Sequence, residues 1–161
     1  MSSSSSKDPL PKRRAVARLM AVQALYQIQV ADQTVDEVLA QHLAGPLRLD
    51  EDDADADIAA PDREHLVAVV REASAKSADI DAMIAKSLSS GWELERIEPL
   101  LRAILQAGVA ELCMGKKDLP PKAVISEYTD IARSFYDGPE VGLVNAVLDR
   151  LAKTLHDGNI G

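Results

Sequence analysis

Aromatic residues are scarce in this sequence: Phe, Trp and Tyr together make up 3% of its 161 residues, and glycine contributes only eight. Strands of β-sandwiches and barrels draw on aromatic residues and their turns draw on glycine, so both shortages argue against an all-β fold. The single cysteine, Cys113, cannot form an internal disulfide, which excludes a disulfide-stapled secreted protein and makes a cytoplasmic location the expectation. No apolar run approaches the roughly 18 residues typical of a membrane span.

Charge is distributed unevenly along the chain, whose formal net charge is −8. Residues 32–64 hold eleven acidic residues against two basic ones, whereas residues 1–18 hold five basic residues against one acidic one. A basic end on an otherwise acidic chain predicts an anionic partner at that end. Residues 1–11 are expected to form a disordered polar tail. Residues from about 45 to 60 are expected to form a solvated acidic loop.

Hydrophobic spacing predicts helices along the rest of the chain, and no segment shows the alternation typical of a strand. The first helix is expected to be the buried central one, because residues 19–31 carry no charge. We therefore predict one all-helical domain over residues 12–158, with six or seven helices. These helices cover about residues 12–31, a short segment after a Thr34–Glu37 capping box, residues 61–89 with a weak point at 74–77, a segment from Pro99 to Gly115, one opened by Pro120 and Pro121, and a last one ending near Gly158.

Signatures of catalysis and of metal binding are absent from the sequence. Phosphate loops, dinucleotide-binding loops and nucleophile elbows are not found. The histidines His42, His65 and His156 are far apart and lack partners at ligand spacing, so we expect no metal site and no cofactor. Nothing near Cys113 would favour a thiolate, and a buried inert thiol is expected. A binding protein, rather than an enzyme, is the interpretation that remains.

The basic cluster at the start of the first helix is the strongest sign of a binding site. Lys12, Arg13 and Arg14 come first, and Arg18 follows Arg14 at a spacing of four residues, on the same helix face. Guanidinium groups suit phosphate oxygens and can stack on unpaired bases. From spacing alone, RNA contact and a merely solvated helix start remain equal alternatives.

The sequence resembles the NusB family of transcription antitermination factors in two blocks. Residues 13–31, RRAVARLMAVQALYQIQVA, look like the opening helix of that family, whose signature runs from a basic cluster through A-R to A-V-Q-A-L-Y. The second block is similar from Lys122 through Ala132-Arg133-Ser134-Phe135 to Val144-Asn145 and Val147-Leu148-Asp149-Arg150. A weaker third block contains Glu111. The resemblance spans roughly residues 13–153.

This resemblance implies about seven helices in two packed subbundles and a cytoplasmic role beside bacterial RNA polymerase. Proteins of this family bind the single-stranded boxA element of ribosomal RNA leaders together with NusE, a small-subunit ribosomal protein, and suppress Rho-dependent termination. The implied RNA-binding residues are Lys12, Arg13, Arg14, Arg18, Lys122, Leu143 and Asn145. The implied NusE-binding residues are Tyr26 and, on the helix over residues 98–112, Glu98, Arg102 and Glu111.

Four positions depart from the family pattern: Gln106, Ser126, Leu143 and Ala146. An aromatic residue commonly stands at Leu143, and its loss implies weaker binding to RNA alone and greater dependence on the partner. Two assignments stay open at this stage. A role for Asn145 as a helix cap is as good an explanation as RNA contact. Tyr26 could equally belong to the apolar core, since it lies on the same helix stripe as Leu19 and Val22.

Two rival interpretations belong to other functional classes. The first is a helical protein–protein adaptor that does not bind RNA. The second is a fragment of an RNA cytosine methyltransferase, because NusB-like domains precede the catalytic domain in one such family. The chain contains no methyl-donor glycine loop, so a free-standing methyltransferase is not expected.

Overall fold

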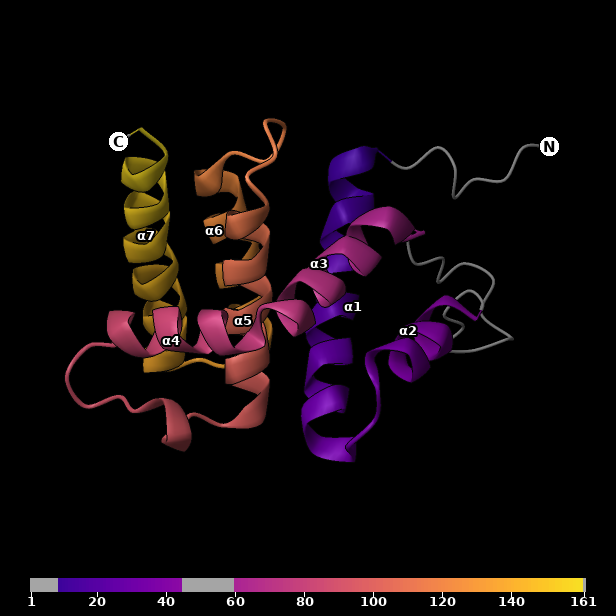
Figure 1. Ribbon diagram of the computed structural model, residues 1–161, viewed down its shortest axis with the longest axis horizontal. Coiled ribbons are helices and arrows are strands. Elements are labelled where there is room, and N and C mark those ends of the chain that lie inside the picture. The colour runs from indigo at the N-terminus through magenta and orange to yellow at the C-terminus, as the bar shows by residue number, and fades with distance from the viewer. Residues whose placement is uncertain (1–8, 45–59, 161) are drawn as a thin grey trace.

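The computed structural model describes residues 9–44 and 60–160, with side chains as far as residue 155. These residues form seven α-helices, a short 3-10 helix and no strand (Figure 1). The fold is therefore all-α with seven helices, as predicted. The elements are α1 (Leu10–Ala31), α2 (Val35–Leu43), α3 (Arg63–Ala75), α4 (Ser77–Ser87), η2 (Leu94–Arg96), α5 (Pro99–Met114), α6 (Pro121–Phe135) and α7 (Pro139–Ile160).

The helices form two packed groups, which confirms the two subbundles (Figure 1). In the first group α1, α2 and α3 pack on one another, and in the second α4 and α6 flank α5 and α7. Helix α5 joins the groups because it packs on α1 and α3 as well as on α6 and α7. Residues 103–111 of α5 are all buried. The central helix is thus α5, and the expectation that the first helix would be central is wrong.

Local sequence explains most helix ends. The capping box at α2 is present: Glu37 N donates to Thr34 Oγ1 at 3.1 Å, and Thr34 N donates to Glu37 Oε1 at 2.9 Å. Helix α5 begins at Pro99 and ends at Met114, and its C-cap is Gly115, whose φ of 59° lies in the left-handed region that glycine adopts without strain.

The predicted weak point in residues 61–89 is a full break. Lys76, with φ −112° and ψ 25°, separates α3 from α4, and the two helices run in different directions (Figure 1). Residues 1–8 of the expected tail and 45–59 of the expected acidic loop lie outside the described residues. Leu10 and Pro11, assigned to the tail, belong to α1.

Candidate nucleic-acid interface

The first turns of α1 bring three basic residues together without an acidic residue of their own. Lys12 is exposed, and Arg13 and Arg14 are half-buried. A helix N-terminus carries a partial positive charge, so cations there need acceptors from elsewhere. The structure supplies such acceptors from two other elements, the N-cap of α3 and the loop between α5 and α6.

Arg14 is the centre of this arrangement. Its Nη2 donates to Asp118 Oδ2 at 2.8 Å, and its Nε lies 3.5 Å from Asp62 Oδ2. Asp62 is the N-cap of α3 and also donates its backbone N–H to the carbonyl of Arg13 at 3.1 Å. The hydrogen bond from Arg14 lowers the pKa of Asp118, so this carboxylate is charged at neutral pH. These contacts fix the start of α1 against two other segments.

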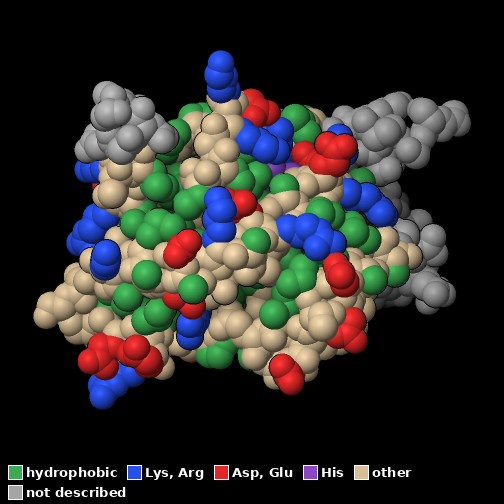
Figure 2. All heavy atoms as spheres, viewed as in Figure 1, with side chains coloured by type: hydrophobic (Ala, Val, Ile, Leu, Met, Phe, Trp, Pro, Cys, Tyr) green, Lys and Arg blue, Asp and Glu red, His purple; other side chains and the backbone are tan. Residues whose placement is uncertain are grey.

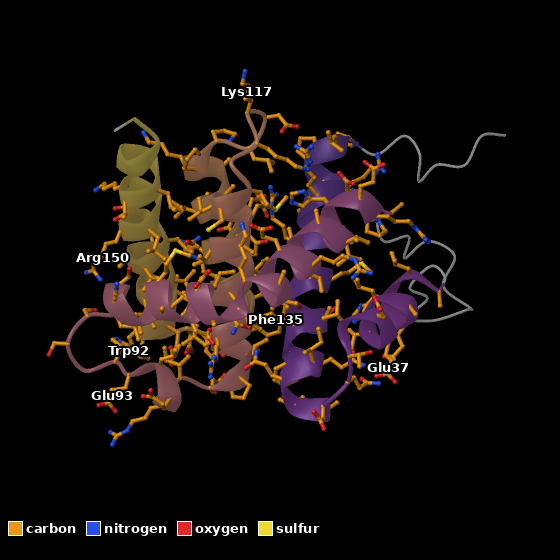
Figure 3. All side chains as sticks on the ribbon, in the orientation of Figure 1. Glu37, Trp92, Glu93, Lys117, Phe135 and Arg150 are labelled. Carbon is orange, nitrogen blue, oxygen red and sulfur yellow. The ribbon has the colours of Figure 1, made fainter. Side chains whose placement is uncertain are left out.

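The loop between α5 and α6 adds two cations that sequence reasoning missed. Lys116 and Lys117 are exposed in this loop, and Lys117 points away from the body of the protein at its tip (Figure 3). Figure 2 shows Lys and Arg side chains gathered over the same end of the molecule, with Asp and Glu between them. The available signal was a Lys-Lys pair between two helices. We call Lys12, Arg13, Arg14, Lys116 and Lys117 the cationic end.

Arg18 does not belong to this surface, which corrects the prediction. Its side chain is 5% exposed and binds Glu111 of α5: Nε lies 2.9 Å from Oε1 and Nη2 2.6 Å from Oε2. Glu111 itself is 1% exposed, so the expectation that it contacts a partner is also wrong in this structure. The physical reason is that a buried arginine must be paired, and its partner is 93 residues away in the sequence.

Two further side chains complete this buried group, the Glu111 cluster of Arg18, His65, Glu111 and Tyr128. Tyr128 OH donates to Glu111 Oε1 at 2.9 Å, and His65 Nε2 lies 3.1 Å from the same oxygen. Burial raises the pKa of Glu111, but its interactions with His65 and Arg18 outweigh burial and lower the pKa to about 2. The cluster joins α1, α3, α5 and α6, so its role is to hold the two helix groups together.

A groove between α6 and α7 begins near the cationic end. It has a volume of about 300 Å³ and brings together two residues predicted for RNA, Lys122 and Asn145, both exposed. Asn145 lies inside α7, so it is not a helix cap. Leu143 is 4% exposed and packs in the core, which corrects its assignment as an RNA contact. The lining residues of this α6–α7 groove are Lys122, Ile125, Ser126, Thr129, Arg133, Asn145 and Asp149.

A second groove, of about 430 Å³, lies where α1 meets the start of α5 and the end of α6. Tyr26 is 40% exposed and Phe135 44% exposed, so Tyr26 is a surface residue rather than a core residue. Phe135, labelled in Figure 3, was not predicted. Its signal was its place at the end of an apolar helix stripe. The lining residues of this Tyr26 groove are Gln23, Tyr26, Glu98, Pro99, Leu100 and Phe135.

Of the other residues assigned to the partner, Glu98 reaches this groove and Arg102 is held elsewhere. Glu98 Oε1 accepts a hydrogen bond from Tyr136 OH. Arg102 Nη2 donates to Asp81 Oδ2 of α4 at 2.7 Å, and its side chain keeps 32% of its surface exposed. Arg102 therefore ties α4 to α5 and does not line the groove.

Two other features are absent from the described residues. No described helix is long and apolar enough to cross a membrane. Residues 9–44 and 60–155 contain no group of three or more His, Cys, Asp or Glu side chains placed to hold a metal ion.

The two-group helical fold, the cationic end and the Tyr26 groove define a small all-helical protein with a basic surface and a groove of exposed aromatic side chains. Comparison with known proteins identifies which one: residues 15–153 match the model of the NusB family, and the chain belongs to that family. The Transcription antitermination protein NusB of Caulobacter vibrioides is 44% identical to this chain over 89% of it and 95% of the relative.

Solved structures agree on the fold. NusB from T. maritima is 28% identical in sequence to this chain, and its structure superposes with a TM-score of 0.68. The match covers 87% of this chain and 90% of the T. maritima chain. A structure of the antitermination factors NusB and NusE in complex with dsRNA is 25% identical, with a TM-score of 0.67, and covers 88% of this chain and 97% of its own.

Proposed function

We propose that this protein is a transcription antitermination factor that binds the single-stranded boxA element of ribosomal RNA leaders together with NusE. In this role it acts in the cytoplasm beside RNA polymerase and suppresses Rho-dependent termination. The observation that carries the proposal is the cationic end, where α1 and the α5–α6 loop place five cations beside the α6–α7 groove. Family membership supports it, because the relatives are antitermination proteins and one solved relative is in a complex with NusE and dsRNA.

RNA phosphates would meet the cationic end first. Lys117 and Lys116 are exposed, and the Arg14 guanidinium, held by Asp62 and Asp118, would bind a phosphate in place of the Asp118 carboxylate. Lys122 continues the positive surface into the α6–α7 groove, where Asn145 offers both a donor and an acceptor. Arg18 serves this surface indirectly, by fixing α1 through the Glu111 cluster.

NusE would occupy the Tyr26 groove. Exposed aromatic side chains flanked by polar groups are typical anchors of protein interfaces, and Tyr26 and Phe135 lie together there with Glu98 at the rim. The groove and the cationic end share no residue. The two partners can therefore bind at the same time.

A salt titration of a labelled boxA RNA, with and without NusE, tests the proposal. With about four phosphates engaged, a single-strand slope of roughly −0.7 per contact predicts about a sevenfold loss of affinity for each doubling of salt. Lys116→Gln with Lys117→Gln should weaken binding and flatten the slope. Each of the two substitutions is also made singly, and Lys86→Gln, which removes one positive charge on the exposed end of α4, is the control for the single variants and should do neither.

Salt-independent binding would contradict the proposal. Weak RNA binding that NusE does not improve would favour the alternative of an adaptor that contacts protein only.

A further inference from the structure

The Tyr26 groove combines two aromatic rings with one acidic side chain. Tyr26 of α1 and Phe135 of α6 (Figure 3) line it with 40% and 44% of their surfaces exposed. Among the described residues that line the groove, Glu98 alone is charged. The volume of about 430 Å³ is near the lower end of the usual range for ligand sites, so the groove has room for a side chain rather than for a helix.

The Glu98 carboxylate is held by one oxygen and has the other available. Glu98 is the N-cap of α5, and its Oε1 accepts a hydrogen bond from Tyr136 OH. No described residue donates to the second oxygen, Oε2, and the residue is exposed. Glu98 can therefore accept a donor from a partner without losing the bond that orients its carboxylate.

The surroundings of Glu98 are negatively charged. Burial, the hydrogen bond to Glu98 and the charges of Glu98 and Glu140 raise the pKa of the Tyr136 hydroxyl. Arg96, the basic residue nearest to Glu98 in the sequence on its N-terminal side, is already paired with Glu93 at 3.0 Å. A cation carried by a partner would thus be attracted to this groove, and an anion would be repelled.

Arginine is the side chain that this combination suits best. Its guanidinium group is planar, so it can stack on aromatic rings while its edge donates to a carboxylate. A lysine ammonium group carries the same charge but has no flat face and no pair of parallel N–H donors. An aliphatic side chain would use the rings and leave the Glu98 carboxylate without a partner. The two rings and the acid together therefore select a flat cation.

We propose that the Tyr26 groove receives one arginine side chain of NusE, with its guanidinium stacked on the rings of Tyr26 and Phe135 and paired with the Glu98 carboxylate. This inference rests on the proposed function, in which NusE occupies the groove, and adds the identity of the side chain that anchors it. Arginine is one of the residues that most often supply the binding energy of protein interfaces.

Glu98→Gln tests the charge, because glutamine keeps the length of the side chain and still accepts from Tyr136 OH. Affinity for full-length NusE, measured by calorimetric titration, should fall by about tenfold, near the lower value for a hydrogen bond to a charged group because Glu98 is exposed. Glu64→Gln, an equal change of charge at an exposed position of α3 outside the groove, is the matched control and should leave the affinity unchanged. Unchanged affinity of Glu98→Gln would overturn the proposal.

Phe135→Leu tests the stacking, because leucine keeps an apolar surface and removes the aromatic face. Affinity for NusE should fall by about three- to tenfold, the value of a cation–π contact at a partly exposed site. Phe135 is exposed, so the urea midpoint of the variant should match that of the wild type. Unchanged affinity would mean that the groove holds an aliphatic anchor, and the arginine pocket would be refuted.

Variants of NusE identify the arginine. Each of its arginine residues is changed in turn to alanine and to lysine, and every variant is titrated against the wild type and Glu98→Gln. At one arginine the losses from alanine and from Glu98→Gln should not add, since both remove the same pair. Lysine at that position should not restore the affinity. Additive losses at every arginine would overturn the proposal, and so would full affinity of the lysine variant.

Failure of this inference is distinguishable from failure of the proposed function. If NusE binds the wild type and Tyr26→Ala weakens that binding, docking of NusE in the groove stands. Unchanged affinity of Glu98→Gln in the same assay then refutes the arginine pocket alone. If NusE does not bind the wild type, both fail.

Discussion

Arg14 and Asp118 form a salt bridge of 2.8 Å between the first turns of α1 and the loop that follows α5. The Asp118 carboxylate is 60% exposed and takes up the guanidinium edge that a phosphate would use. A phosphate entering this site must therefore displace a carboxylate that the protein itself provides. The cationic end therefore contains a carboxylate that would compete with RNA under the proposed function.

Asp118→Asn should raise RNA affinity. Removing the competing carboxylate frees Arg14, and for a largely exposed pair we expect about a two- to fivefold gain at low salt. Asp36→Asn is the matched control, since it changes net charge equally but breaks an exposed pair with Arg71 on α3. Fluorescence anisotropy with a labelled RNA measures both variants. An equal gain for both would mean that only net charge matters.

Arg18→Ala should destabilise the fold rather than act at the RNA surface. It leaves Glu111 buried without its arginine partner, at a cost of about 3–5 kcal/mol in the free energy of unfolding. Replacing the pair by apolar residues, Arg18→Met with Glu111→Leu, removes the unpaired buried charge but should recover only part of that loss, because the buried Tyr128 hydroxyl then lacks its acceptor. Urea unfolding measures both. If the Arg18→Ala protein were as stable as the wild type and bound RNA more weakly, Arg18 would be a direct RNA contact and this prediction would be wrong.

Acid should weaken the fold through Glu111. Its pKa is about 2 in the folded protein, against 4.5 for an unperturbed glutamate, so the folded state binds fewer protons in that range. The stabilisation is fully present above about pH 4.5 and is lost as the pH falls toward 2, in total on the order of 3 kcal/mol. Urea midpoints between pH 2 and 6 should show a shallower fall for Arg18→Met with Glu111→Leu than for the wild type. If the urea midpoints of the two proteins fell in parallel with pH, Glu111 would not be the source of the acid sensitivity.

Tyr26→Ala should weaken NusE binding by about tenfold or more, as truncation of an aromatic anchor does. Val30→Ala is the control, because Val30 is 51% exposed on the same helix and does not line the groove. Calorimetric titration with purified NusE measures the difference. Affinity for RNA alone should not change in either variant, and a matching loss for Val30→Ala would refute the groove as the docking site.

The helices could be predicted from sequence because their signals are local. The capping box at Thr34, the prolines that open α5 and α6, and the glycine that closes α5 each act within one turn. The break at Lys76 was visible only as a weak point. Its completeness depends on packing, since α3 lies on α1 while α4 lies on α7.

The candidate site was harder to predict because its contacts are distant in sequence. The resemblance named Lys122 and Asn145, which line one groove in the structure, but it gave no sign that Arg14 contacts Asp118, 104 positions away. Arg18 was misassigned from its spacing to Arg14. It also lies four and seven residues before Val22 and Leu25, on the apolar stripe, and a charge at such a position indicates a buried pair.

Helix α1 carries Arg14 near one end and Tyr26 twelve residues later, about 18 Å along its axis. The Glu111 cluster holds the helix at Arg18, which lies between Arg14 and Tyr26. The distance and the angle between Arg14 and Tyr26 are therefore fixed by the helix. Inserting one residue after Arg18 would rotate Tyr26 by about 100° about the helix axis relative to Arg14. Under the proposed function, with RNA at Arg14 and NusE at Tyr26, this helix would fix both the distance and the angle between the two partners.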